Sequence, residues 1–112
     1  YMVLNINDKD YELKYTINIL SKMSANGLDP IRNAENVTGT IANTRKAFYY
    51  GLVEENSKIT EATAGKLMDA YIAEGNAISD VMNMIQDAIF ESLGIDTDAE
   101  TENNVEESGE GK

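Results

Sequence analysis

The sequence predicts an α+β fold that is mostly helical, with a β-hairpin at its start and a disordered acidic tail at its end. Apolar and polar side chains alternate at a period of two over residues 2–15, as they do in strands. Apolar side chains recur at helical spacing over residues 16–93, and residues 94–112 are acidic with few apolar side chains. Because 112 residues suffice for one small domain, we expect a single domain over residues 2–93 and a tail over residues 94–112.

The expected hairpin has strands over residues 3–6 and 11–15, with a polar turn over residues 7–10. Asn and Asp favour such a turn because they tolerate left-handed backbone conformations. The alternation places these apolar side chains on a single buried face: Leu4, Ile6, Tyr11, Leu13 and Tyr15. A two-stranded hairpin is only marginally stable by itself, so we expect helices to cover this face.

Four helices are expected after the hairpin, over residues 16–25, 38–53, 60–74 and 76–93. Thr60 is a good N-cap for the third helix. Glycines typical of helix ends follow the first, third and fourth helices, at Gly27, Gly75 and Gly94. The predicted apolar stripes, in helix order, are Ile17, Leu20 and Met23; Val37, Ile41, Phe48 and Leu52; Ala64, Leu67, Met68 and Tyr71; and Ile78, Met82, Ile85, Ile89 and Leu93.

The composition excludes several classes of protein. The chain has 20 Asp and Glu residues against 9 Lys and Arg residues, so its formal charge of −11 repels the phosphate backbone of nucleic acids. It has no Cys for disulfides or Cys-rich zinc sites and no His for general-base catalysis, so we expect neither an enzyme nor a cofactor. It also lacks the apolar run of a membrane span and the pattern of a signal peptide, so we expect a cytoplasmic setting.

Acidic residues of the tail match the spacing of a calcium-binding loop, but the match is incomplete. Oxygen-bearing side chains stand at the ligand positions of such a loop: Asp96, Asp98, Glu100, Glu102, Asn104 and Glu107. Thr101 stands where the sharp turn requires Gly, and we expect no helix after the loop. A solvated acidic tail is therefore the favoured interpretation.

Two patterns on the last helix have both a functional and a structural interpretation. Glu91-Ser92-Leu93 is similar to the Asp-Ser-Leu phosphopantetheine site of acyl carrier proteins, but there the serine begins a helix, whereas Ser92 ends one. Asp80, Asp87 and Glu91 share one helix face and have the chemistry for Mg²⁺ binding or acid–base catalysis. We favour a solvated helix face opposite the apolar stripe as the interpretation of these carboxylates.

Some apolar side chains lie away from the predicted buried stripes, and we take them as the candidate partner-binding site. Phe90 lies about 120° from Ile78 around the last helix, and Tyr50 lies about 180° from Ile41 around the second. Exposed aromatic side chains beside polar ones are typical of binding surfaces. The candidate residues are Tyr49, Tyr50, Val53, Met84 and Phe90. The alternative is that Phe90 packs on the hairpin and that Tyr50 packs under a loop or the tail.

Three blocks of sequence resemble a known family. They are the hairpin sequence of residues 4–15 (LNINDKDYELKY), leading into Ile19-Leu20; then Ala47-Phe48-Tyr49-Tyr50-Gly51-Leu52; and then Ile59-Thr60-Glu61-Ala62-Thr63 with Leu67-Met68-Asp69-Ala70-Tyr71-Ile72. In this order the blocks, which fall within residues 3–93, resemble tail assembly chaperones of long-tailed phages that infect Gram-positive bacteria. The chain departs from the family pattern at Asp8, where the hairpin turn usually has Gly.

The resemblance implies a non-enzymatic chaperone of virion assembly, without catalytic residues or a cofactor. Members of this family bind the long helical tape measure protein, keep it soluble and help to recruit tail tube subunits. They act in the host cytoplasm and are absent from the mature virion. Two alternatives, based on the residues alone, are an acidic inhibitor that mimics DNA and a small protein-binding adaptor; self-association also stays open.

Overall fold

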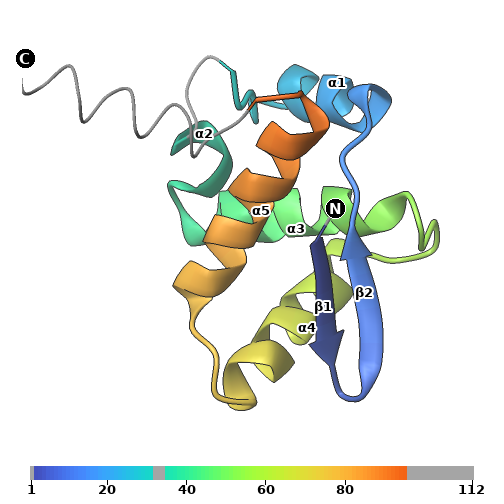
Figure 1. Cartoon of the computed structure of the whole chain (residues 1–112), viewed down its shortest axis with the longest axis vertical. Helices are drawn as coiled ribbons and strands as arrows, with labels where there is room; N and C mark the ends of the chain where they lie inside the picture. Colours follow the sequence, from blue (N-terminus) through green and yellow to red (C-terminus); the bar gives the residue numbers. More distant parts are fainter. Residues whose placement is uncertain (1, 32–34, 96–112) are drawn as a thin grey trace, which may run out of the picture.

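The fold begins with a two-stranded antiparallel sheet and continues with helices, as the sequence predicts (Figure 1). The computed structural model describes residues 2–31 and 35–95. The strands are β1, Met2–Ile6, and β2, Lys9–Leu13. The helices are α1, Ile17–Ala25; α2, Glu35–Thr38; α3, Ile41–Val53; α4, Glu61–Ala73; and α5, Ile78–Ser92. Nearly all of the predicted tail, from position 96 onward, lies outside the described residues.

The hairpin turn is tighter than the sequence predicts. Its two central residues, Asn7 and Asp8, have φ angles of 54° and 64°. Both angles are left-handed, which the common two-residue hairpin turn requires. Residues 9 and 10 therefore belong to β2 and pair with β1. The backbone N–H of Asn7 also donates a hydrogen bond of 2.8 Å to the Glu74 carboxylate, which ties the turn to the end of α4.

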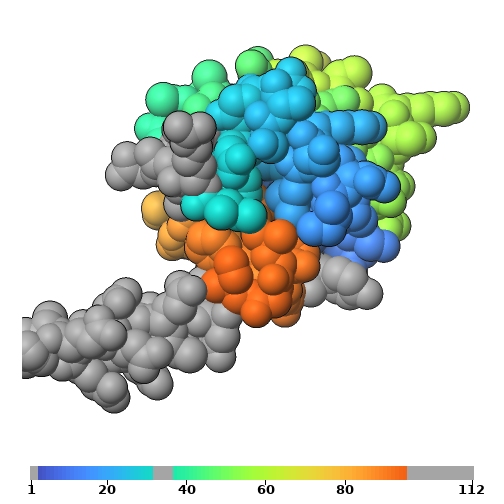
Figure 2. Space-filling model, turned by 90° about the horizontal axis from the view of Figure 1, so that it is seen from above, coloured from blue at the N-terminus to red at the C-terminus, as the bar shows by residue number. Residues whose placement is uncertain are grey.

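Helix α3 is the central element of the fold, because it contacts β2 and each of the other four described helices. In Figure 1, α5 runs diagonally across α3, and α4 lies below α3 beside the hairpin. Seen from above in Figure 2, α1 and the segment after it (blue to cyan) lie beside the last turns of α5 (orange). The apolar face of the hairpin is thus covered by helices, as a two-stranded sheet requires for stability.

The core contains four of the five residues predicted for the hairpin face, and Tyr11, the fifth, is half-buried. Two buried polar side chains have hydrogen-bond partners: the Gln86 amide donates to Thr38 Oγ1, and the Thr44 hydroxyl donates to the Thr40 carbonyl, both at 2.8 Å. The buried apolar residues are Leu4, Ile6, Leu13, Tyr15, Ile19, Leu20, Met23, Leu28, Val37, Ala47, Phe48, Leu52, Ala64, Met68, Val81, Ile85, Ala88 and Ile89.

Threonine caps fix the starts of three helices. The side-chain oxygens of Thr16, Thr40 and Thr60 each accept a hydrogen bond from the backbone N–H three residues later, at 3.2, 3.0 and 3.1 Å. This confirms the predicted cap at Thr60. The cap at Thr40 moves the start of α3 from the predicted residue 38 to Ile41, and Thr38 belongs instead to the short α2.

Two isoleucines that the sequence assigned to buried stripes are exposed. Ile17 is 66% exposed and Ile41 is 75% exposed. Ile17 lies about 110° around α1 from the centre of its buried face. Ile41 lies only about 50° from the centre of the buried face of α3, between Phe48 and Leu52 around the helix. The prediction for Ile41 was wrong because this side chain lies in the first turn of α3, ahead of the packed part of the helix, which begins at Thr44. The buried residues of α3 are Thr44, Ala47, Phe48, Gly51 and Leu52.

The buried faces of α4 and α5 also differ from the predicted stripes. On α5, Val81 and Ala88 are buried, whereas the predicted Ile78, Met82 and Leu93 are only half-buried. On α4, the predicted Ala64 and Met68 are buried, and Leu67 and Tyr71 are half-buried. The buried face of α5 thus includes Val81 and Ala88 beside the predicted Ile85 and Ile89.

A close approach between elements occurs where α3 meets the end of β2 and the two residues that follow it. The backbone N–H of Lys14 donates to the Gly51 carbonyl at 2.8 Å, and the buried Tyr15 hydroxyl donates to the Ala47 carbonyl at 2.7 Å. A Cβ atom at Gly51 would lie 2.5 Å from Tyr15 Oη and 2.9 Å from Leu13 Cδ2. Glycine is therefore required at position 51 by the space available, although it lies inside a helix, where it is intrinsically unfavourable.

We predict that Gly51→Ala destabilises the protein by about 1–3 kcal/mol, because overpacking against Leu13 and Tyr15 outweighs the helix propensity gained. Gly65→Ala is the matched control, because Gly65 also lies within a helix but its added Cβ meets only the flexible Arg45 side chain, at 3.2 Å. This control should raise stability by up to about 1 kcal/mol. Urea unfolding measures both variants; equal effects would contradict the close-approach explanation.

Burial raises the pKa of the Tyr15 hydroxyl above its ordinary value of 10.0. The folded state therefore keeps the proton that the unfolded chain releases above pH 10, so stability is full below that pH and falls above it. The slope from this one group reaches about 1.36 kcal/mol per pH unit. We predict that Tyr15→Phe flattens the loss of stability between pH 10 and 11.5, measured by urea unfolding. A variant slope as steep as that of the wild type would contradict this assignment.

Candidate functional site

The five residues predicted to bind a partner lie on α3 and α5 and are all half-buried against the core. Tyr49 and Tyr50 form an edge-to-face pair with ring centroids 5.2 Å apart. The Tyr50 hydroxyl also accepts a hydrogen bond of 3.3 Å from the Asn26 amide, just after α1. Desolvation, followed by the nearby Tyr49 and Glu61, raises the pKa of Tyr50. The hydrogen bond with Asn26 links the Tyr50 ring to the segment that follows α1.

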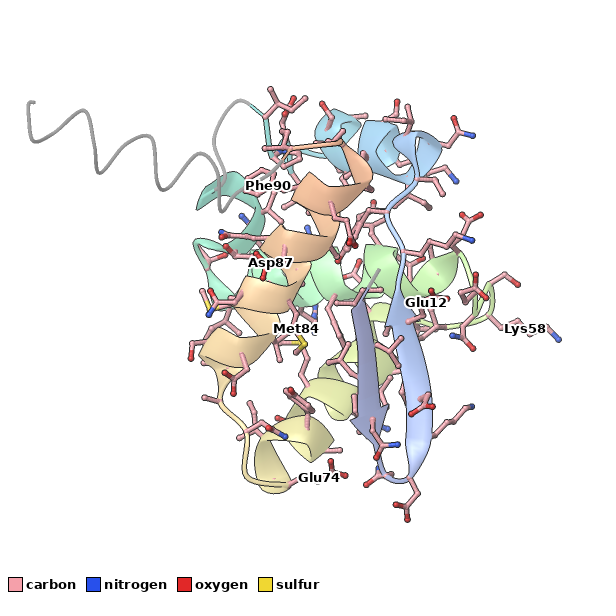
Figure 3. All side chains as sticks on the ribbon, in the orientation of Figure 1. Glu12, Lys58, Glu74, Met84, Asp87 and Phe90 are labelled. Carbon is pink, nitrogen blue, oxygen red and sulfur yellow. The ribbon has the colours of Figure 1, made fainter. Side chains whose placement is uncertain are left out.

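These five residues do not form one continuous surface. Met84 and Phe90 are six positions apart on α5, which separates their directions by about 120° around the helix. Figure 3 shows them at different levels of α5, with Phe90 near the helix end and Met84 lower down. A role of these residues in binding stays a prediction.

An apolar surface lies on α4, beside the starts of α3 and α5. This surface, which we call the α4 groove, has a volume of about 520 Å³. It holds Ile41, which is 75% exposed, and Ile72, which is 39% exposed. The groove is lined by Ile41, Arg45, Ala62, Gly65, Lys66, Met68, Asp69, Ile72 and Ile78. Apolar side chains from three helices therefore converge on a site that is open to solvent.

Charged side chains form part of the lining of the α4 groove. Arg45 forms a salt bridge of 3.4 Å with Glu61, and both side chains are half-exposed. The stem of Arg45 lies over Gly65, since a Cβ there would be 3.2 Å from Arg45 Cδ. Within the described residues, neither Lys66 nor Asp69 has an ion-pair partner. The groove thus combines an apolar lining with unpaired charges of both signs.

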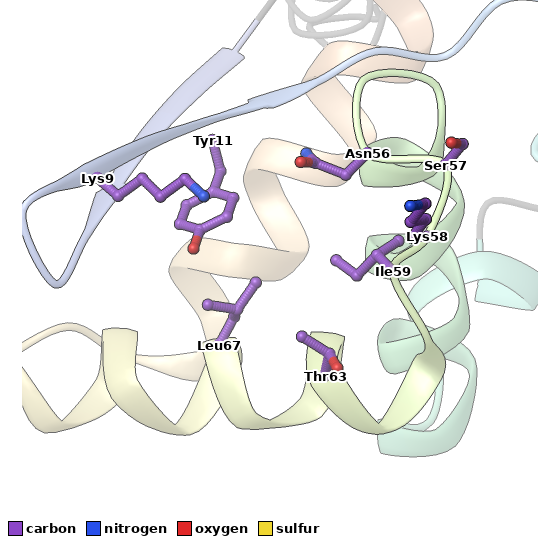
Figure 4. A pocket seen from close by; sticks show the side chains of 8 residues that line it. All are labelled: Lys9, Tyr11, Asn56, Ser57, Lys58, Ile59, Thr63 and Leu67. Carbon is purple, nitrogen blue, oxygen red and sulfur yellow. The ribbon is translucent and has the colours of Figure 1, made fainter.

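A second hollow, the hairpin pocket, lies between β2, α4 and the loop that joins α3 to α4 (Figure 4). It has a volume of about 380 Å³ and is lined by Lys9, Tyr11, Asn56, Ser57, Lys58, Ile59, Thr63 and Leu67. Tyr11, Ile59 and Leu67 face one another across it, and the Lys9 ammonium lies 5.4 Å from the centre of the Tyr11 ring. Lys58 projects away from the body of the molecule in Figure 3. Polar groups make up more of this lining than of the α4 groove.

The carboxylates of α5 have a structural role at one position. Asp80 accepts a hydrogen bond of 2.9 Å from the backbone N–H of Ala77, and so it caps the start of the helix. Within residues 2–31 and 35–95, no three acidic side chains gather closely enough to hold a metal ion. The Ser92 hydroxyl donates to the Ile89 carbonyl at 2.8 Å at the end of α5. The proposed calcium-loop spacing lies outside the described residues.

Sequence reasoning missed the α4 groove because it placed Ile41 in the core. One signal in the sequence did indicate an exposed apolar side chain at this site. Ile72 falls outside the predicted stripe of α4, just as Tyr50 and Phe90 fall outside the stripes of their helices. A second signal was Thr40, a good N-cap one residue before Ile41. A helix that begins at Ile41 leaves this side chain in its first turn, at the edge of the domain.

Comparison of the sequence with models of protein families finds no match, and comparisons with curated proteins and with solved structures find none either. In the part of the chain that the structure describes, the helices lack the length and apolar content needed to cross a bilayer. The surface of the protein and the resemblance of the three sequence blocks are therefore the grounds for a proposed function.

We predict that Ile41→Asp leaves the free energy of unfolding within about 0.5 kcal/mol of the wild type, because the side chain is exposed and an acidic residue suits the first turn of a helix. Ile85→Ala, a truncation in the core, should cost about 2–5 kcal/mol. Urea unfolding of both variants tests the assignment of Ile41 to the surface. A loss above 2 kcal/mol for Ile41→Asp would show that Ile41 supports the fold.

Proposed function

We propose that this chain is a non-enzymatic tail assembly chaperone of a long-tailed phage. In this role it binds the tape measure protein, keeps it soluble and helps to recruit tail tube subunits in the host cytoplasm. The partner is a long helical polypeptide with apolar surface, which needs a soluble carrier until the tail assembles.

The observation that carries this proposal is the α4 groove. Exposed isoleucines beside charged side chains, in a groove bounded by helices, match the way in which proteins bind an amphipathic helix of a partner. The chain as a whole is strongly charged, with a formal charge of −11, which favours solubility. An apolar site on a strongly charged carrier is the combination that a solubilising chaperone needs.

The resemblance to the chaperone family adds a second line of support. Its first block coincides with the hairpin that leads into α1, and its second block lies in the last part of α3. Its third block starts at the capped start of α4 and continues through that helix. The three blocks therefore fall, in order, on the hairpin, the last part of α3 and the capped start of α4.

Co-expression with the tape measure protein of the same phage tests the proposal. We predict that the wild-type chain moves most of the tape measure protein into the soluble fraction and co-purifies with it. The double variant Ile41→Asp/Ile72→Ser should reduce the soluble share severalfold, because it removes the two exposed apolar side chains of the groove.

Ile31→Asp is the matched control, because Ile31 is also 75% exposed but does not line the α4 groove. It adds the same charge and should leave the soluble share unchanged. Circular dichroism establishes that each variant is folded. Tape measure protein that stays insoluble beside the wild-type chain would contradict the proposed function.

A further inference from the structure

We propose that the free edge of β2 binds an extended segment of a partner polypeptide in which apolar and basic side chains alternate. The segment adds a third strand to the hairpin. Unpaired backbone groups along this edge, the hairpin pocket on one of its faces and a cluster of carboxylates on the other face support the inference. The surface is separate from the α4 groove and does not depend on the function proposed above.

The register of the hairpin directs part of the β2 backbone away from β1. Ile6 pairs with Lys9 across the two-residue turn, so every second residue of β2, counted from Lys9, forms its backbone hydrogen bonds with β1. The backbone N–H and C=O groups of Asp10 and Glu12 therefore point outward. Within the described residues these groups have no hydrogen-bond partner. Donors and acceptors at this spacing match an extended chain, whereas the backbone groups of a helix are already paired within the helix.

The same edge already has a backbone partner one step further along the chain. The backbone N–H of Lys14 donates to the Gly51 carbonyl at 2.8 Å, and the Lys14 ammonium pairs with Glu55 at 3.4 Å. Helix α3 and the loop after it thus cover this edge from Lys14 onward. The unpaired part lies at Asp10 and Glu12, and a segment of about three or four residues is long enough to pair with it.

The hairpin pocket lies beside this part of the edge. In Figure 4, β2 lies between β1 and the pocket. Half-buried apolar side chains line the pocket from three elements: Tyr11 from β2, Ile59 from the loop and Leu67 from α4. The side chains of a strand point alternately to the two faces of its sheet, so every second side chain of an added strand lies on the pocket side. The pocket therefore favours an apolar side chain at these positions.

The opposite face of the edge is acidic. A hollow of about 450 Å³ on that face is lined by Val3, Asp10, Glu12, Glu55 and Asn56. Three of these residues carry carboxylates and none carries a cation. Glu55 is paired with Lys14, but neither Asp10 nor Glu12 has an ion-pair partner among the described residues. Basic side chains at the alternate positions of an added strand pair with these two carboxylates.

The two lysines of the hairpin pocket do not offset the acidic face. Lys9 and Tyr11 alternate with Asp10 and Glu12 along β2, so they lie on the other face of the sheet. The Lys9 ammonium lies 5.4 Å from the centre of the Tyr11 ring. Lys58 projects away from the body of the molecule (Figure 3). A strand whose apolar side chains face the pocket therefore places its basic side chains on the face opposite to Lys9.

Charge also distinguishes this occupant from two others. A second copy that pairs through its own β2 brings Asp10 and Glu12 of both copies onto one face of a shared sheet, where like charges repel. Residues 96–112 of the chain itself have seven acidic residues and one Lys, so they do not complement the acidic face. The charges on β2 thus disfavour self-pairing and favour a basic strand.

Fluorescein-labelled peptides of eight residues test the proposal with the full-length purified chain in 0.15 M salt. One peptide alternates Lys and Leu, and its control has the same composition as repeats of Lys-Lys-Leu-Leu, which places lysines and leucines on both faces of a strand. The net charge of the chain attracts both peptides equally. Fluorescence anisotropy should show that the alternating peptide binds at least about tenfold more tightly.

Backbone methylation tests pairing with the edge without any change in the protein. Two further alternating peptides carry N-methyl groups on all lysine nitrogens or on all leucine nitrogens. In an added strand one of these sets faces β2 and the other faces solvent. Methylation of one set should therefore weaken binding about tenfold or more, and methylation of the other set much less.

A charge variant assigns the binding to the acidic face. Glu12→Gln should weaken binding of the alternating peptide about threefold, because it removes an unpaired carboxylate beside the edge. Asp87→Asn is the matched control, because it removes the same charge from an exposed position on α5. It should change the dissociation constant by less than about 1.5-fold. In NMR spectra of the labelled chain, peptide binding should slow exchange of the Asp10 and Glu12 amides about tenfold, with little change at Tyr11.

Four results would overturn the inference. They are equal binding of the two peptide orders, equal effects of the two N-methyl sets, equal effects of Glu12→Gln and Asp87→Asn, or unchanged exchange of the Asp10 and Glu12 amides in the complex. Slow exchange of both amides in the free chain would also contradict it. A dimer in sedimentation velocity would then identify a second copy as the occupant, and a monomer would identify a segment of the chain itself.

Discussion

The close approach of α3 to the end of β2 is the constraint on which the rest of the fold depends. A helix backbone lies within hydrogen-bond distance of a strand end and of a buried tyrosine hydroxyl, through Lys14, Tyr15, Ala47 and Gly51. A helix can approach this closely only if the residue at the point of contact has almost no side chain, as Gly51 does. Because α3 contacts β2 and the other described helices, its position determines where they pack.

The same constraint explains why an apolar surface is left open. Gly51 and Ala47 turn the second half of α3 toward the hairpin, and the helix carries Ile41 about 15 Å away from Gly51. There the first turn of α3 meets α4 and the start of α5, whose own buried faces are already filled by Ala64, Met68 and Val81. The α4 groove therefore results from how the core packs, and its exposed isoleucines, Ile41 and Ile72, lie outside that core.

Local chemistry made much of the fold predictable from the sequence. Alternation identified the hairpin, and the cap at Thr60 and the glycine after α1 identified helix ends, because these signals depend on residues close together in the chain. The orientation of each helix was less predictable, because it depends on which small residues, such as Ala47 and Gly51, touch a distant element. The candidate site was defined by the side chains that fell outside the predicted stripes. It therefore missed Ile41, which lies on a predicted stripe but is exposed in the first turn of α3. A role of Tyr49, Tyr50, Val53, Met84 and Phe90 in binding stays a prediction.

Hydrogen–deuterium exchange on the complex with the tape measure protein would locate the bound surface without any substitution. We predict slower amide exchange across α4 and the first turns of α3 and α5 in the complex than in the free chain, with little change in α1. Protection confined to α1 or to the hairpin, with α4 unchanged, would contradict it.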